Sequence, residues 1–415
     1  MHDTMASPRR SAPCAAELSP SAGSPERIRK IAVAELRPGM TVVDTGLSWT
    51  EHPFLYSAAG PVDSRRQVEA LLAEGYRETF IREERTPAPP RRSGMSPSSR
   101  PLPGRDDYAR ARALQDESVG VISAFMRAAR LGKPLDREAP ARLVEKVIDT
   151  VAGNPDALVS LANLRRNDAY SYTHSLNVSV LAVVFGQYLG LDKDALRGLG
   201  EAGLFHDLGK TRIPDAILDK PGRLTPEEFA VIKSHPGEGA DILESQGLGS
   251  PKVLAAIRDH HEKFNGAGYP RGLAGDRLER AAQVVGLVDS YDAMTSNRPY
   301  RGAIQPNTAM RILFAMRDKD FSRELLESFI KCLGIYPVGS PVRLRDGSVA
   351  LVCGSNPESP LLPTVKIILD ARMRPRPHLV LDLASPQVKA LGDAVVIEAP
   401  LDMSVLGMDP AGFLF

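Results

Sequence analysis

Histidine is concentrated in one part of this chain. Five of the eight histidines lie between positions 174 and 261: His174, His206, His235, His260 and His261. Neutral imidazole and carboxylate suit first-row divalent metals, and this segment also contains many Asp and Glu residues. The cluster therefore indicates a metal site. The remaining histidines, His2, His52 and His378, lie far from it in the sequence.

The strongest local signal is the run His206-Asp207-Leu208-Gly209-Lys210. On a helix, His206 and Lys210 share a face at i,i+4, and Asp207 and Lys210 do so at i,i+3. The side chains of adjacent His and Asp diverge, so we expect the pair to reach two metals, with Asp207 as a bridge. Lys210 could then reach a phosphate oxygen or a leaving group. The alternative is an ordinary helix C-terminus that stops at Gly, with Lys on the helix dipole.

Two further sets of residues support the same interpretation when they are read together with this run. His260 and His261 end a helical pattern, and adjacent buried histidines each need a partner. Asp289 lies in the apolar run at 284–289, where a buried carboxylate needs a metal or an ion pair. Taken alone, Asp289 fits a metal ligand and a salt-bridge partner equally. His174 alone is typical of a satisfied core residue, and His235 alone of a helix end.

A loop and an arginine pair complete the chemical signals. Gly266 and Gly268 allow a tight turn, and Tyr269 offers a stacking face and a hydroxyl beside the histidines. Arg298 and Arg301 follow Asp289 closely in sequence and could pair with phosphate through planar donor forks. Alone, the Gly-Tyr-Pro turn is typical of a structural turn, and the arginines of a helix surface.

These residues must be positioned by helices, because the chain from 107 to 338 has mainly helical periodicity. The apolar spacing predicts helical segments at Val119–Ala129, Leu143–Val151, Leu176–Leu189, Leu196–Leu208, Glu227–Lys233, Val253–His260, Ala281–Met294, Thr308–Met316 and Leu325–Leu333. Breaks are expected at Asn154-Pro155, Gly190, Pro221-Gly222 and Pro236-Gly237. The run Thr225-Pro226-Glu227-Glu228 predicts a helix start, with Thr as the N-cap, Pro at the first position and Glu at the third.

The segments that flank the helical region differ from it in amino-acid composition and in periodicity. Residues 1–26 and the Pro/Ser/Arg-rich stretch 85–106 are typical of a disordered tail and a linker. Between them, 27–84 predict a small α+β domain, with strands near Ile31–Val33, Thr41–Val43 and Thr79–Ile81 and a helix around Val68. From 339 to 415 we expect a small β appendage and tail, with a hairpin turn at Asp346-Gly347.

Composition narrows the class of protein. The formal net charge is +1, which supplies no bulk electrostatic case for a nucleic-acid polymer. The three cysteines, Cys14, Cys332 and Cys353, are far apart, which fits a reducing cytoplasm better than a disulfide framework. The most apolar stretch, 176–191, is short and interrupted by polar residues, so we expect a buried helix and no membrane insertion.

Taken together, the motifs resemble the HD-GYP family of phosphohydrolases. The similarity runs in order through His174, HDLGK (206–210), IPDAIL (213–218), LTPEE (224–228), KSHPGEG (233–239), HHEKFNGAGYP (260–270) and VDSYDAMTSNRPYR (288–301). ELRPGM (35–40) and SWTEHPFL (48–55) resemble a small domain of unknown function often placed before HD-GYP modules. The resemblance implies a mainly α fold: an HD-type helical bundle with a small N-terminal α+β domain and a short C-terminal β appendage.

The same resemblance implies an activity and assigns roles. It implies a phosphodiesterase of bacterial signalling that hydrolyses cyclic di-GMP to pGpG, or onward to GMP, with two divalent ions, Fe or Mn. Lys210 would assist the scissile phosphate, Arg298 and Arg301 would hold phosphates, and Gly268 and Tyr269 would shape the pocket. The implied metal ligands are His174, His206, Asp207, His235, His260, His261 and Asp289.

One position departs from the family pattern. Family members with three metals resemble one another in having Glu four residues before the first ligand His, and here that residue is Tyr170. A phenol is a poor substitute for a bridging carboxylate. We therefore expect two metals, and we expect the cut after pGpG to be inefficient.

Several alternatives stay open at this point. The protein could hydrolyse another nucleotide, or it could be a catalytically weak sensor of cyclic dinucleotides or a protein-interaction platform. Partners beyond cyclic di-GMP, such as a second copy or a signalling protein, and the role of the N-terminal domain are not specified by the sequence.

Overall fold

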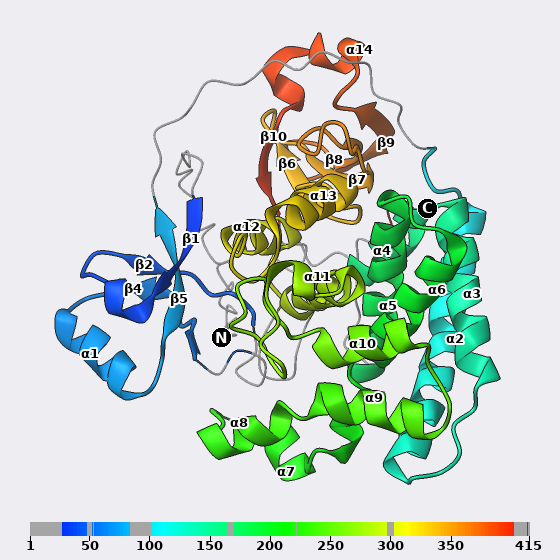
Figure 1. Cartoon of the computed structure of the whole chain (residues 1–415). Coiled ribbons are helices and arrows are strands. Elements are labelled where there is room, and N and C mark those ends of the chain that lie inside the picture. The colour runs from blue at the N-terminus through cyan, green and yellow to red at the C-terminus, as the bar shows by residue number, and fades with distance from the viewer. Residues whose placement is uncertain are drawn as a thin grey trace, which may run out of the picture.

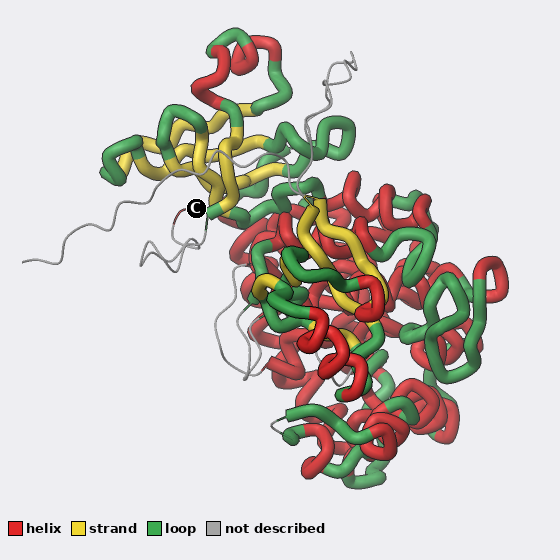
Figure 2. The backbone as a smooth tube through the Cα atoms, turned by 90° about the vertical axis from the view of Figure 1, so that its left-hand side faces the viewer, coloured by secondary structure: helices red, strands yellow, loops and turns green. Residues whose placement is uncertain are grey.

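The computed structural model describes residues 27–47, 52, 54–83, 101–163, 170–220, 222–296, 303–401 and 413. A helical domain forms the bulk of the molecule, with one small sheet domain beside it and another above it (Figures 1 and 2). This arrangement confirms the predicted fold class. The expected disordered tail, and most of the expected linker, lie outside the described residues.

The helical domain is organised around α5, which is buried on all sides. Every residue from 174 to 186 is buried, as expected for a helix whose apolar residues are not confined to one face. Helices α6 and α11 pack against α5. The helices of this domain are α2 (Arg105–Arg130), α3 (Glu138–Gly153), α4 (Pro155–Asn163), α5 (Tyr170–Tyr188), α6 (Lys193–Phe205), α7 (Asp215–Leu218), α8 (Pro226–Ile232), α9 (His235–Ser245), α10 (Pro251–Asp259), α11 (Arg280–Thr295), α12 (Pro306–Ala315) and α13 (Arg323–Leu333).

Two predicted breaks separate consecutive helices: α3 ends at Gly153 just before Asn154-Pro155, and α8 ends at Ile232 shortly before Pro236-Gly237. Pro155 is the first residue of α4, and Pro236 lies in the first turn of α9. Proline is tolerated there, because the first backbone N–H groups of a helix have no partner within it. The breaks were predicted from the sequence, but the helices that begin at them, α4 and α9, were not. The predicted start of α8 is confirmed, with a capping box in which Thr225 accepts from the Glu228 N–H.

The N-terminal domain is a sheet covered by one helix, as predicted. Its elements are β1 (Arg27–Ala32), a 3₁₀ turn (Val33–Glu35), β2 (Thr41–Val42), β3 (Leu55–Tyr56), β4 (Gly60–Pro61), α1 (Arg65–Ala73) and β5 (Glu78–Glu83). The strands follow the order β1-β5-β2-β4, and β3 pairs in parallel with β5. Val33 lies in the 3₁₀ turn, so β1 ends one residue earlier than the sequence suggested.

The C-terminal region is a complete antiparallel sheet. Its elements are β6 (Pro341–Leu344), β7 (Val349–Gly354), β8 (Thr364–Leu369), β9 (Pro375–Asp382), α14 (Pro386–Lys389), a 3₁₀ turn (Gly392–Val395) and β10 (Ile397–Pro400). The predicted hairpin joins β6 to β7, with Gly347 at a φ of 85°. The last strand, β10, pairs with β6. The expected tail is therefore partly structured, because α14, the 3₁₀ turn and β10 lie between Pro386 and Pro400.

The N-terminal domain shares the core of the helical domain. Val43, Leu47 and Phe80 belong to the same buried cluster as the apolar residues of α5 and α11. A second, smaller cluster lies inside the N-terminal sheet itself. This packing fixes the N-terminal domain against the helices, and Figure 1 shows its strand β1 beside α12.

Within the described residues, the helices are too short or too polar to cross a bilayer. Cys332 and Cys353 are buried thiols, and the structure does not describe Cys14.

Truncation of the core should destabilise the helical domain. The ring of Phe329 is fully buried and contacts Phe185 and Tyr291, with centroids 5.2 and 5.6 Å apart. Phe329→Ala should lower the free energy of unfolding by about 3–5 kcal/mol, because it leaves a cavity in a close-packed core. Urea denaturation followed by circular dichroism measures the change. Phe314→Ala, at a ring that is 40% exposed, is the matched control and should have little effect.

Candidate metal centre

The structure brings all seven predicted ligands together. They come from helix ends and from two long buried helices: His174 on α5, His206 and Asp207 at the end of α6, His235 at the start of α9, His260 and His261 at the end of α10, and Asp289 on α11. The helical packing therefore gathers residues that are far apart in the sequence.

The His206-Asp207 pair does not lie on a regular α-helix, which corrects the predicted extension to Leu208. Helix α6 ends at Phe205, His206 is its C-cap, and Leu208–Arg212 form a 3₁₀ turn. Residues three apart are aligned in a 3₁₀ turn. Accordingly, the Lys210 Nζ donates to Asp207 Oδ2 at 2.8 Å. The predicted i,i+3 relation holds, but the i,i+4 face of His206 and Lys210 does not exist.

Gly209 explains why the chain turns there. A Cβ at this position would lie 1.9 Å from the carbonyl oxygen of His235. Only a residue without a side chain allows the backbone after α6 to lie against the start of α9. The glycine is thus required by a close backbone contact, and this contact brings Asp207 next to His235.

Three of the imidazoles are oriented by the ends of helices. The Nδ1 atoms of His206, His235 and His260 lie 2.8, 2.7 and 2.6 Å from the carbonyl oxygens of Gly203, Ile232 and Ile257. Each of these carbonyls is in the last turn of a helix, where it has no partner within the helix. A carbonyl only accepts, so each Nδ1 must donate, and each Nε2 lone pair is left to face the centre.

His174 is oriented in the same way by a carboxylate. Its Nδ1 lies 2.7 Å from Asp292 Oδ2, and Asp292 is fully buried on α11. The hydroxyl of Ser296 also donates to that oxygen. Asp292 was not among the residues predicted from the sequence. Its position three residues after Asp289, on the same face of one helix, was a signal that could have found it.

The donor atoms form two groups joined by Asp207. His174, His206 and Asp207 make up one group, and His235, His260 and His261 make up the other. Asp207 Oδ2 lies 3.5 Å from His206 Nε2, and its Oδ1 lies 3.4 Å from His235 Nε2. The two oxygens of one carboxylate therefore face different groups, which is the arrangement of a bridging ligand.

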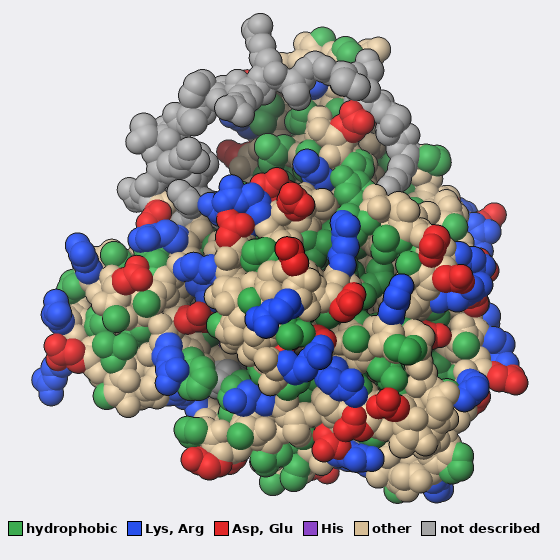
Figure 3. All heavy atoms as spheres, viewed as in Figure 1, with side chains coloured by type: hydrophobic (Ala, Val, Ile, Leu, Met, Phe, Trp, Pro, Cys, Tyr) green, Lys and Arg blue, Asp and Glu red, His purple; other side chains and the backbone are tan. Residues whose placement is uncertain are grey.

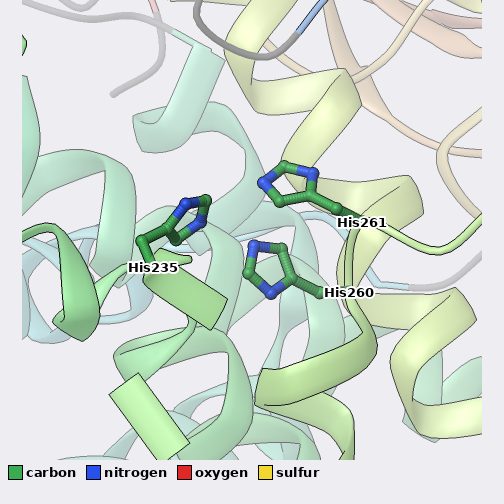
Figure 4. A group of neighbouring side chains, drawn as sticks. All are labelled: His235, His260 and His261. Atoms are coloured by element: carbon green, nitrogen blue, oxygen red, sulfur yellow. The ribbon is translucent and has the colours of Figure 1, made fainter. Parts of the chain in front are cut away.

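The remaining carboxylate belongs to the first group. Asp289 Oδ1 is 3.1 Å from His174 Nε2 and 3.7 Å from His206 Nε2. In the second group, Figure 4 shows His235 on one side and the adjacent His260 and His261 on the other, with their rings turned toward one another. The ring centroids of the adjacent pair are 4.1 Å apart.

Burial sets the charge of the second group. It lowers the pKa of His235 to about 3 and that of His260 to about 4, and it also lowers the pKa of His261 well below its ordinary value. These three imidazoles are therefore neutral at neutral pH, the state in which an imidazole binds a metal.

The carboxylates stay ionised despite their burial. Burial alone would raise the pKa of Asp207, but Lys210 and His206 outweigh it and hold this pKa well below the usual range. Burial alone would also raise the pKa of Asp289, but the neighbouring histidines His174, His206 and His261 together outweigh it and hold this pKa low. In the reverse direction, burial lowers the pKa of His174, but Asp289 and Asp292 raise it to about 9. The first group of donor residues thus attracts positive charge.

The residues fit divalent metal ions. The Nε2 atoms of His206, His235, His260 and His261 and the Oδ1 of Asp207 are buried and have no hydrogen-bond partner among the described residues. Leaving so many buried acceptors unsatisfied in one place is costly. Convergent imidazole and carboxylate donors are what a first-row divalent metal requires.

The Gly-Tyr-Pro loop lies directly against the histidines. The Tyr269 ring stacks on His261 with centroids 4.9 Å apart and an angle of 29° between the planes. A Cβ on Gly268 would lie 2.3 Å from the Lys263 backbone nitrogen, so the loop packs tightly on the chain that follows the His pair. Tyr269 therefore forms a wall of the site.

Two buried acids that the sequence reasoning did not single out hold this loop. Glu262 accepts from the backbone N–H groups of Arg271 and Leu273, at 2.6 and 3.0 Å. Asp259 accepts from the guanidinium of Arg271, with an Nε–Oδ1 distance of 3.0 Å. Both acids are within three residues of the His pair, so they tie the far side of the loop to the ligand segment.

The structure does not describe every predicted site residue. Arg298 and Arg301 lie outside the described residues, and so does the side chain of Tyr170. Their predicted roles stay predictions.

Comparison with known families matches two parts of the chain. Residues 147–325 match the HD domain, and residues 28–140 match a domain of unknown function, DUF3391. The HD match contains all seven gathered ligands, and the second match begins at the N-terminal sheet and extends into α3.

Individual relatives extend these matches. A cyclic di-GMP phosphodiesterase of Pseudomonas aeruginosa is 33% identical over 369 residues, which cover 86% of this chain and 89% of the relative. A 3′3′-cGAMP-specific phosphodiesterase of Vibrio cholerae is 34% identical over 163 residues, 38% of each chain. Among solved structures, an HDG"Y"P protein from Bdellovibrio bacteriovorus is 19% identical with a TM-score of 0.46, covering 73% of this chain and 98% of that one.

The partner of His174 should matter for metal affinity. Asp292→Asn keeps the shape of the side chain but removes the charge that orients the imidazole, so metal affinity should fall about 10- to 100-fold. Competition with a metal chelator, followed by metal analysis of the protein, measures the change. Asp241→Asn, at a side chain that is 63% exposed, is the control and should retain the affinity of the unmodified protein.

Proposed function

Because the chain belongs to the HD-GYP family of metal-dependent HD-domain phosphohydrolases, we propose that it hydrolyses cyclic di-GMP to the linear dinucleotide pGpG. The observation that carries this proposal is the pair of ligand groups joined by Asp207, with Lys210 bonded to the same carboxylate. The similarity to a cyclic di-GMP phosphodiesterase over 86% of the chain supports the choice of substrate.

The site would hold two divalent ions, Fe or Mn. His174, His206 and Asp289 would bind one, His235, His260 and His261 the other, and Asp207 both. When bound, such ions polarise a phosphodiester and lower the pKa of a water molecule. The two groups of donor atoms support a count of two.

The protein's own side chains would position the substrate and handle charge. The Lys210 ammonium would stabilise negative charge on the phosphoryl oxygens and donate a proton to the departing 3′ oxygen. Its side chain is 26% exposed, so it can face a substrate while it is bonded to Asp207. The Tyr269 ring would stack against the nucleotide beside His261, and Arg298 and Arg301 would pair with the phosphates.

The reaction would stop mainly at pGpG. Tyr170 stands one helical turn before His174, where three-metal family members have Glu. Without that carboxylate, a third ion would lack its bridging ligand, so the second hydrolysis to GMP would be slow.

A second candidate substrate is another cyclic dinucleotide. The similarity to a 3′3′-cGAMP-specific phosphodiesterase favours this alternative. The two substrates share the ring of two phosphodiesters and differ in one base, so the metal centre by itself treats them alike. A panel of cyclic di-GMP, 3′3′-cGAMP and cyclic di-AMP at equal concentration separates the alternatives by kcat/KM.

Removal of the bridging carboxylate should abolish turnover. Asp207→Ala takes one ligand from each group, so kcat for cyclic di-GMP should fall by about 10³-fold or more, the scale of losing a principal source of electrostatic stabilisation. Chromatography of the nucleotides after incubation with anaerobic Fe(II) or with Mn(II) measures product. Asp194→Ala, at a side chain that is 89% exposed, is the control. Full activity of the metal-replete Asp207→Ala protein would refute the proposed chemistry.

Metal counting should return two ions per chain after anaerobic purification. In the same samples, pGpG should accumulate while GMP forms slowly.

Tyr170→Glu should add a third ion and speed GMP formation, because it restores the carboxylate of three-metal relatives. Three ions in the unmodified protein, or cyclic di-GMP binding without any pGpG, would contradict the proposal; the latter result would indicate a sensor.

A further inference from the structure

A buried ion pair joins the N-terminal domain to the helical domain. Lys30 on β1 is 5% exposed and Asp320 is 4% exposed. The Lys30 Nζ lies 2.9 and 3.0 Å from the two carboxylate oxygens of Asp320, and Glu78 on β5 adds a contact at 3.1 Å. Removing one member of such a pair leaves a buried charge without compensation, which is strongly destabilising locally. The contact therefore fixes Asp320 relative to the N-terminal sheet.

The same acid also holds the chain that follows the His260-His261 pair. Lys263 Nζ lies 3.3 Å from the Oδ2 of Asp320. Phe264 N–H donates to the Asp320 carbonyl at 3.0 Å, and Asn265 N–H donates to the Lys319 carbonyl at 2.9 Å. Three consecutive residues, starting two positions after His261, are thus attached to 319–320.

The charges of this cluster are stable at neutral pH. Burial alone would raise the pKa of Asp320, but Lys30 and Lys263 outweigh it and lower the pKa to about 2. Burial would lower the pKa of Lys30, but Asp320 and Glu78 raise it instead. The cluster is therefore a permanent ionic contact, with one acid between two lysines from different domains.

Asp320 anchors one end of a loop whose other end is already held. Residues 263–274 leave the His pair, carry Tyr269 and return to Glu262 and Asp259 through Arg271 and Leu273. The loop edges also meet, because the Gly275 N–H donates to the Phe264 carbonyl at 2.9 Å. The position of the Tyr269 ring over His261 thus depends on anchors at both ends, and one of these anchors is fixed by the N-terminal domain.

The N-terminal domain reaches Tyr269 by a second route. Phe54, beside β3, meets Phe229 of α8 edge to face at 6.1 Å, and Phe229 meets Tyr269 edge to face at 6.0 Å. Arg223 of the helical domain donates to the Glu74 carbonyl at 2.6 Å, which adds a hydrogen bond between the two domains near Phe54. Figure 3 shows Lys and Arg side chains on both sides of the seam between the two domains.

We propose that Lys30 is a positioning residue of the active site: through Asp320 it holds the 263–274 loop, so that the N-terminal domain fixes Tyr269 where a cyclic dinucleotide binds. This inference rests on the proposed function for the identity of the substrate. It assigns the N-terminal domain a role in substrate binding and none in metal binding, since all seven metal ligands lie in the helical domain.

The test compares Lys30→Met with Arg29→Ala in the full chain. Arg29 is the neighbouring residue on β1, and its exposed side chain pairs with Glu83. Hydrogen–deuterium exchange reports the backbone amides of 263–275. Kinetics are measured with cyclic di-GMP, whose bases need the loop, and with bis(p-nitrophenyl) phosphate, a small diester that needs only the metals and Lys210.

Lys30→Met should speed deuterium uptake in 263–275 and lower kcat/KM for cyclic di-GMP by about 10- to 100-fold, chiefly through KM, as expected when a binding group is displaced by about 1 Å. The rate with bis(p-nitrophenyl) phosphate and the metal content should stay within about twofold, because the ligand groups do not include the loop. Arg29→Ala should change none of these quantities.

Phe54→Ala is the second variant, in case Lys30→Met does not fold. The Phe54 ring is 36% exposed, so its loss should be tolerated, and it should change the same quantities in the same direction. Unchanged exchange in 263–275 for both variants would overturn the inference, as would an equal loss with both substrates. If the unmodified protein does not cleave cyclic di-GMP, the proposed function fails, but exchange and the small diester still decide the role of Lys30.

Discussion

The site depends on one recurring interaction: the Nδ1–H of a histidine bonded to a carbonyl at the end of a helix. The carbonyls of Gly203, Ile232 and Ile257 have no partner within their own helices, and each is satisfied by an imidazole three residues later. This bond fixes both the orientation and the tautomer of the ring. The same bond therefore satisfies a carbonyl at the helix end and directs the Nε2 lone pair of the imidazole toward the centre. The point at which each helix ends thus determines where its ligand lies.

The remaining architecture brings these helix ends together in a buried volume. α5 and α11 are buried along most of their length and supply His174, Asp289 and Asp292. Gly209 removes the side chain that would separate the end of α6 from the start of α9. The same burial keeps the second-group imidazoles neutral, while Lys210 and the first-group histidines keep the carboxylates ionised. The packing that stabilises the bundle thus also produces the charge distribution that a divalent metal requires.

The N-terminal domain packs directly against the helical domain and is part of this architecture. Its apolar residues share the main core, and its buried Lys30 contacts an acid beside the Tyr269 loop. A movement of the N-terminal domain away from the helices would break the buried Lys30–Asp320 ion pair. It would therefore act directly on the loop that carries Tyr269. The C-terminal sheet likewise has a core cluster of its own, while Val349, Leu351, Ile368 and Leu369 of the same sheet belong to the main core.

The sequence by itself determined the residue types: a cluster of histidines with aspartates, a Gly-Tyr-Pro turn beside them, and helical periodicity from 107 to 338. The helical periodicity and the N-cap of α8 follow from local spacing, whereas the full set of seven residues and the fold class were expected from the family resemblance that these motifs carry together. Local signals located the breaks near Pro155 and Pro236 but not the helices that begin there, because a proline that begins a helix resembles one that follows its end.

Only the tertiary structure decided how those residues act together. Asp292, Glu262, Asp259 and the Lys30–Asp320 pair matter through partners that are distant in sequence or through burial, and no local pattern encodes either property. The division of the donors into two groups, with the two oxygens of Asp207 facing different ones, likewise depends on where three helix ends and the two buried helices meet in space. A sequence can specify which atoms are able to bind a metal, but their convergence is a property of the packed core.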